Sequence, residues 1–161
     1  MNVYEFAMEL ETAGRNHYLK LVEETPSETG KRIFQVLADE ELRHYQFLSE
    51  MSQKNQAVVD SDNVADAEKT FHEMLETGDL QGYMLPMDYY TQGILLEDKS
   101  IDFYREKART EEDPAARIFF LKLYFEEKKH KLLLENIIEV IMEPQRKLES
   151  PELVRPLEQD I

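Results

Sequence analysis

Residues 37–44 read LADEELRH, and residues 123–130 read LYFEEKKH. Each stretch holds a leucine, two adjacent glutamates and a histidine at identical spacing, and the second lies 86 positions after the first (37 to 123). The same offset, without a gap, relates Glu11 to Glu97. It also relates these pairs: Tyr4 and Tyr90, Leu10 and Leu96, Tyr18 and Tyr104, Phe34 and Phe120, Leu48 and Leu134. The register indicates a duplicated unit in which each copy supplies one Glu and one Glu-x-x-His.

Long helices account for most of the chain. Only 5 Gly and 6 Pro occur, so turn signals are scarce. Prolines favour helix starts and the positions just past helix ends, and four of them divide the chain: Pro26, Pro86, Pro114 and Pro144. The pattern predicts helices over 2–24, 27–52, 87–110 and 114–143. Helix N-caps are expected at Ser27, Asp88 and Asp113.

The connections predict the topology of an all-α four-helix bundle. The first and the last pair of helices are joined by short links, so each pair should form an antiparallel hairpin. The connection over 53–85 is long enough to cross the bundle, with a short helix over 65–76, and it allows the second and third helices to run parallel. We expect one domain over 1–143, made of a repeat at 2–52, the crossover 53–85 and a repeat at 87–143. A proline-containing tail, 144–161, should be extended or pack against a neighbour.

Each predicted helix carries an apolar stripe with alternating three- and four-residue spacing, and a glutamate interrupts the middle of each stripe. The four glutamates are Glu11, Glu41, Glu97 and Glu127. His44 and His130 each follow one of them by three residues. Buried carboxylates are costly and repel one another, and no basic residue lies in any stripe. Two divalent cations would balance the four charges, so the sequence predicts a two-metal site.

Several nearby residues have more than one interpretation. Tyr18 and Tyr104 either pack in the core or donate a hydrogen bond to a ligand carboxylate of the opposite hairpin. Glu40 and Glu126 fall about 100° away from the stripes on a helix, so we expect them on a solvated face. Gly14 either leaves room beside the metals or permits close helix packing.

Composition excludes several classes of function. The chain has 161 residues and a formal net charge of −15, which disfavours nucleic acid and anionic membranes as partners. It has no cysteine, which excludes disulfides and thiol catalysis. No apolar run approaches the roughly 20 residues of a membrane span. We therefore expect a soluble cytoplasmic protein.

These residues resemble the ferritin-like di-iron carboxylate proteins, and within them the rubrerythrin-like branch. In that family one Glu from each of two helices and Glu-x-x-His from the other two bind the metals. The resemblance covers roughly 2–143 and implies a ferritin-like four-helix bundle. It implies two iron ions, with manganese or zinc as alternatives, held by Glu11, Glu41, His44, Glu97, Glu127 and His130. By analogy, Glu41 and Glu127 bridge the metals. Tyr18 and Tyr104 match the family's tyrosine seven residues after a ligand.

Two departures from the rubrerythrin pattern bear on function. The C-terminal rubredoxin module of rubrerythrins needs four cysteines, and this chain has none. Electrons would therefore come from a separate donor protein, either rubredoxin-like or a flavoprotein. Rubrerythrins also carry an extra Glu one turn before the third-helix ligand, where this chain has Ile94.

The leading hypothesis from the sequence is a di-iron oxidoreductase that reduces peroxide or dioxygen. The first alternative is a ferroxidase or iron-storage protein of ferritin type. The second is a helical module whose metal is structural. The resemblance also leads us to expect a homodimer or a higher homo-oligomer.

Overall fold

The computed structural model describes residues 3–53 and 87–149, with side chains described as far as residue 143. This part of the chain forms four α-helices and no strand. They are α1 (Val3–Glu24), α2 (Glu28–Ser52), α4 (Met87–Thr110) and α5 (Pro114–Glu149). The predicted crossover helix over 65–76 and residues 150–161 of the predicted tail lie outside the described residues.

Local sequence signals explain where the helices begin. Ser27 caps α2, because its hydroxyl oxygen accepts a hydrogen bond from the Gly30 amide at 3.3 Å. Asp113 caps α5, since its carboxylate accepts from the Ala116 amide at 3.0 Å, and Pro114 follows at the first helical position. The prediction for Asp88 is wrong: α4 begins at Met87, so Asp88 lies in its first turn, where its charge favours the helix dipole.

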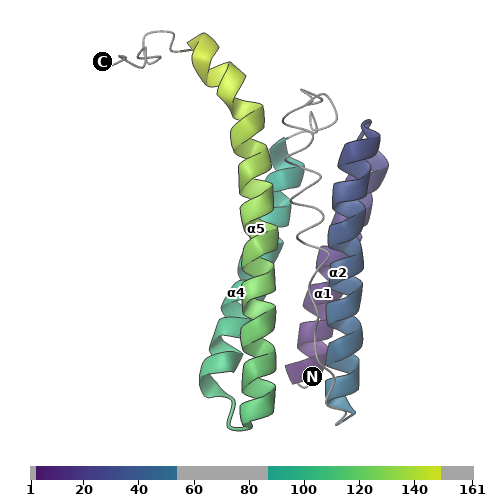
Figure 1. The fold of residues 1–161 in the computed structure, drawn as a ribbon, viewed down its shortest axis with the longest axis vertical. Coiled ribbons are helices and arrows are strands. Elements are labelled where there is room, and N and C mark those ends of the chain that lie inside the picture. Colours follow the sequence, from purple (N-terminus) through teal and green to yellow (C-terminus); the bar gives the residue numbers. More distant parts are fainter. Residues whose placement is uncertain (1–2, 54–86, 150–161) are drawn as a thin grey trace, which may run out of the picture.

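The helices form two antiparallel hairpins that pack into one bundle (Figure 1). The chain rises along α1, descends along α2, descends again along α4 and rises along α5. The prediction that the second and third helices run parallel is therefore confirmed. Besides its hairpin partner, α1 packs on α4, and α2 packs on α5. This is a ferritin-like four-helix bundle.

Two apolar clusters fill the two ends of the bundle. One contains the C-terminal half of α1 and the N-terminal half of α2, with Leu21 and Phe34 among its buried members. The other contains the opposite halves, with Ala7 and Leu48. Each fully buried large side chain contributes about 1.5–3 kcal/mol. All the glutamates and histidines of the stripes lie between the clusters, in the middle of the bundle.

The end of α5 differs from the prediction. The helix continues through Pro144 to Glu149, whereas the sequence predicted an end at 143. A proline inside a helix removes one backbone hydrogen bond and crowds the preceding turn, which can bend a helix without ending it. The C-terminal end of α5 bends in Figure 1.

None of the described helices combines the length and the apolar character that a membrane crossing requires.

Candidate metal centre

Six side chains from four helices meet in the middle of the bundle. α1 supplies Glu11, α4 supplies Glu97, and α2 and α5 each supply a Glu-x-x-His pair. None of the six is more than 3% exposed: Glu11, Glu41, His44, Glu97, Glu127 and His130. The structure thus brings together all the residues that the sequence singled out as metal ligands.

These side chains form two overlapping groups. The first holds Glu11, Glu41, His44 and Glu127, and the second holds Glu41, Glu97, Glu127 and His130. Within each group the candidate ligand atoms lie within 4.8 Å of one another. Glu41 and Glu127 belong to both groups. The arrangement is that of two adjacent cation sites that share two carboxylates, each site with one further glutamate and one histidine.

Both imidazoles direct Nδ1 at the carboxylates. His44 Nδ1 lies 3.1 Å from Glu11 Oε2 and 3.0 Å from Glu127 Oε1. His130 Nδ1 lies 3.0 Å from Glu41 Oε1 and 3.3 Å from Glu127 Oε2. Each histidine therefore reaches a glutamate of the other hairpin. The two rings are stacked, with centroids 5.8 Å apart.

The outer nitrogens of these rings have no acceptor. Nε2 of His44 and Nε2 of His130 are both buried and make no hydrogen bond within the described part of the chain. Metal-binding histidines usually donate this second N–H to an acceptor that fixes the ring. Here the stacking of the rings and the edge of Tyr18, 6.2 Å from His130, constrain them instead.

The charges of the centre favour the binding of cations. Burial and the carboxylate of Glu127 raise the pKa of Glu41 and of Glu97 well above the ordinary value. Burial alone would lower the pKa of His44, but Glu127 and Glu11 outweigh it and raise this pKa to about 10. For Glu127 itself, the two imidazoles outweigh burial and hold its pKa below the ordinary value. Without divalent cations, the carboxyl groups therefore retain protons, which reduce the negative charge of the centre.

Two tyrosines tie the hairpins together at the centre. The Tyr18 hydroxyl donates to Glu97 Oε1, and the Tyr104 hydroxyl donates to Glu11 Oε1. Each bond runs to the opposite hairpin, as one interpretation of the sequence expected. Burial and the neighbouring carboxylates raise the pKa of both phenols well above 10, so both hydroxyls keep their protons and act as donors. They orient one glutamate of each group.

The donor set fits a pair of divalent metal ions. Four carboxylates and two imidazoles suit iron or manganese better than thiophilic metals. No lysine or arginine among the described residues pairs with the six side chains, so within this part of the chain only the two histidines offset the charge of the four carboxylates. A metal pair would also relieve the repulsion that raises the carboxyl pKa values.

The prediction that Glu40 and Glu126 lie on a solvated face is wrong. Glu40 is 0% exposed and Glu126 is 7% exposed. Each pairs with the base three residues later: Arg43 donates to Glu40, and Lys129 lies 3.3 Å from Glu126. The sequence did contain a signal, since both copies of the repeat place a base at this spacing. The angle of Glu40 and Glu126 from the apolar stripes does not contain this signal.

Position 94 carries no metal ligand. Ile94 is partly buried and packs against the apolar cluster that contains Tyr18. The extra carboxylate typical of rubrerythrins is therefore replaced by packing. Gly93, beside it, makes room for side chains of α5 and α1, since a Cβ there would lie 2.9 Å from Leu134 Cδ1 and 3.1 Å from His17 Nε2.

Gly14 makes room for the carboxylate of Glu41, which belongs to both clusters. A Cβ at this position would lie 3.1 Å from Glu41 Cδ, closer than ordinary contact. We expect Gly14→Ala to displace Glu41 and weaken Mn²⁺ binding about tenfold, a loss of the size seen for perturbed metal surroundings. Gly93→Ala is the control, because its Cβ meets no ligand. Equal Mn²⁺ affinities of the two variants, measured by calorimetric titration, would contradict this role of Gly14.

Metal affinity should rise with pH. His44, with its pKa raised to about 10, is protonated at neutral pH and must lose this proton before Nδ1 can bind a metal. Release of one proton corresponds to about a tenfold gain in affinity per pH unit, so Mn²⁺ should bind about 100-fold more tightly at pH 8 than at pH 6. A pH indicator in weak buffer should report at least one proton released per chain. A pH-independent affinity would contradict the charge state described here.

The comparisons with known proteins agree with this geometry. The family model described as Rubrerythrin matches residues 2–138, which is most of the chain and includes all six clustered side chains. Neither the curated proteins nor the solved structures give a significant match. The match to the family model and the arrangement of the six side chains both indicate a metal site. The family implies a di-iron site, and the two buried clusters can hold metal ions. The chain belongs to the Rubrerythrin family.

Proposed function

We propose that the protein is a di-iron oxidoreductase that reduces hydrogen peroxide to water. The observation that supports this most is the pair of buried clusters that share Glu41 and Glu127. The reaction breaks the O–O bond: one H₂O₂ takes up two electrons and two protons and gives two molecules of water. A separate electron-carrier protein, rubredoxin-like or a flavoprotein, is oxidised in two one-electron steps.

The six side chains would hold two iron ions, and Glu41 and Glu127 are available to both because they belong to both clusters. The ions, when bound, supply the redox equivalents and the Lewis acidity. The side chains of the protein position the ligands and exclude water. Tyr18 and Tyr104 hold Glu97 and Glu11 in place through their hydroxyl hydrogens. The two apolar clusters exclude water from both ends of the centre. The high pKa of both phenols keeps them as hydrogen-bond donors throughout.

Tyr18→Phe should slow peroxide reduction. The substitution removes the donor to Glu97 and leaves the ring's packing, so we expect turnover to fall about tenfold, within the range found when the partner of a metal ligand is lost. Peroxide loss is measured after anaerobic loading with Fe²⁺, with ascorbate as reductant. Tyr89→Phe is the control, since Tyr89 is only partly buried and is not among the residues that contact the six ligands.

Measurements of turnover, iron loading and folding on the native protein distinguish this function from its alternatives. Multiple turnovers of peroxide per iron pair support the proposal. No turnover with any one-electron donor would contradict it. A large hollow assembly that loads far more than two iron ions per chain would favour a ferroxidase or storage protein, and folding that depends on zinc without any redox activity would favour a structural site.

A further inference from the structure

The outer face of α5 carries a line of large apolar side chains that are about half exposed. Four large side chains, Ile118, Leu121, Phe125 and Leu132, are between 43% and 58% exposed. They are four of the seven exposed large hydrophobic residues in the described part of the chain. Their spacing of three, four and seven places them in one line along the helix. A continuous apolar line of this kind is typical of an interaction surface.

The same face is basic in a strongly acidic protein. Between residues 117 and 134 the only acids are Glu126 and Glu127, and both are buried. Glu135 follows them at the edge of the groove between α4 and α5, where it lies 3.7 Å from Lys131. The stretch contains five bases: Arg117, Lys122, Lys128, Lys129 and Lys131. We call the four apolar residues, together with Arg117, Lys122, Lys128 and Lys129, the α5 stripe. Its charge is opposite in sign to the net charge of −15.

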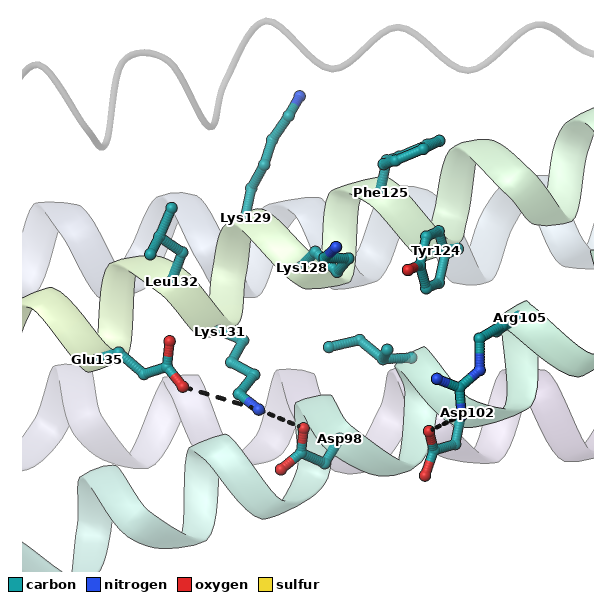
Figure 2. A pocket seen from close by; sticks show the side chains of 11 residues that line it. Asp98, Asp102, Arg105, Tyr124, Phe125, Lys128, Lys129, Lys131, Leu132 and Glu135 are labelled. Atoms are coloured by element: carbon teal, nitrogen blue, oxygen red, sulfur yellow. Dashed lines mark hydrogen bonds and ion pairs between the residues drawn. The ribbon is translucent and has the colours of Figure 1, made fainter.

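The stripe borders a groove between α4 and α5 (Figure 2). On the α4 side the charges are already paired, because Lys131 lies 2.6 Å from Asp98 and Arg105 lies 2.7 Å from Asp102. On the outer side, Lys128 lies over the ring of Tyr124 at 5.3 Å and makes no ion pair with a described residue. Lys122 likewise has no ion pair within the described ranges. Neither of these two positive charges is neutralised by an ion pair with a described residue.

The stripe lies directly outside the metal centre. On a helix with about 100° per residue, Phe125 is about 160° around α5 from Glu127, so the two point to opposite sides of the same turns. Lys128 and Lys129 sit between Glu127 and His130 in the sequence. A helix with its side chains is about 10–12 Å across. A partner seated on the stripe would therefore be separated from the metal ligands by one helix.

We propose that the α5 stripe is the docking site of the acidic electron-carrier protein that reduces the metal centre. This inference rests on the proposed function. Redox encounters use small interfaces with an apolar centre and a charged rim, and opposite charges on the partners accelerate their association. If two copies paired through this face about a twofold axis, their two basic stripes would face and repel each other. An acidic partner is thus favoured over a second copy.

The test uses a purified acidic rubredoxin as the probe, with the whole metal-loaded chain. Its binding is measured by calorimetry at low and high salt. The double variant Lys122→Glu/Lys128→Glu should bind it at least about tenfold more weakly at low salt, and high salt should reduce the difference to about twofold. Lys20→Glu/Lys99→Glu is the matched control, since Lys20 also lies over a tyrosine ring, that of Tyr89 at 4.8 Å. The control has the same net charge and should bind like the native protein.

The second part of the test measures the turnover of peroxide. With reduced rubredoxin as donor, peroxide reduction by the stripe variant should fall by the same factor as binding, while reduction driven by ascorbate should be unchanged. Equal binding by both variants, or no binding by the native chain, would overturn the proposal. So would a native dimer that the stripe variant abolishes, because the stripe would then belong to a second copy. If the native protein shows no ascorbate-driven turnover, the proposed function fails, yet the calorimetry still tests the stripe.

Discussion

Replacing Glu127 with alanine should remove both metal ions, whereas replacing His44 with alanine should weaken only one. Glu127 belongs to both clusters, while His44 belongs to one. Loss of a residue that merely orients a ligand costs 10–100-fold in affinity, so loss of a shared ligand should cost at least about 100-fold at both positions. Mn²⁺ titration of the metal-free proteins, followed by calorimetry, measures affinity and stoichiometry together.

The control for this experiment is Glu126→Gln. Glu126 is buried one residue away from Glu127 but belongs to neither cluster. It should keep two sites with little change in affinity. Helical circular dichroism of each metal-free variant checks that the bundle still forms. If Glu127→Ala keeps one tight site, or if Glu126→Gln loses both, the sharing of Glu127 between two metals is wrong.

Metal removal should lower the melting temperature by about 16–32 °C. Each metal ion at a thousandfold excess over its Kd stabilises the folded state by about 4 kcal/mol, so two ions contribute about 8 kcal/mol, and a chain of this size shifts by about 2–4 °C per kcal/mol. The physical source is the relief of repulsion among four carboxylates less than 4% exposed. Thermal melts with Fe²⁺ under anaerobic conditions, or with Mn²⁺, measure the shift. Glu127→Ala should show almost none of it, and an unchanged melting temperature of the native protein would contradict a metal-stabilised core.

The sequence was sufficient to predict the bundle because its signals agree with one another. The prolines, the caps at Ser27 and Asp113, and the period of the apolar stripes all place the same four helices. The internal repeat then identified the residues that meet at the centre. Two positions 86 residues apart, such as Glu41 and Glu127, occupy equivalent places in the two hairpins.

Features that depend on contacts between helices could not be predicted in this way. Glu40 is buried, although its angle from the apolar stripe of α2 predicts a solvated face. The role of Gly14 rests on the place of the Glu41 carboxylate from the next helix. Pro144 permits either a helix end or a bend, and its local sequence does not distinguish the two. The sequence offered hydrogen bonds from Tyr18 and Tyr104 to the opposite hairpin as one of two interpretations, and the relative position of both hairpins was needed to decide between them.

The most direct test of the metal centre is an anomalous diffraction map of crystals of the protein loaded anaerobically with Fe²⁺, collected at the iron absorption edge. Two peaks per chain are expected. Both should lie between Glu41 and Glu127, one beside Glu11 and His44 and the other beside Glu97 and His130. A single peak, or iron bound only on the acidic surface, would contradict the assignment of these six side chains to a di-iron site.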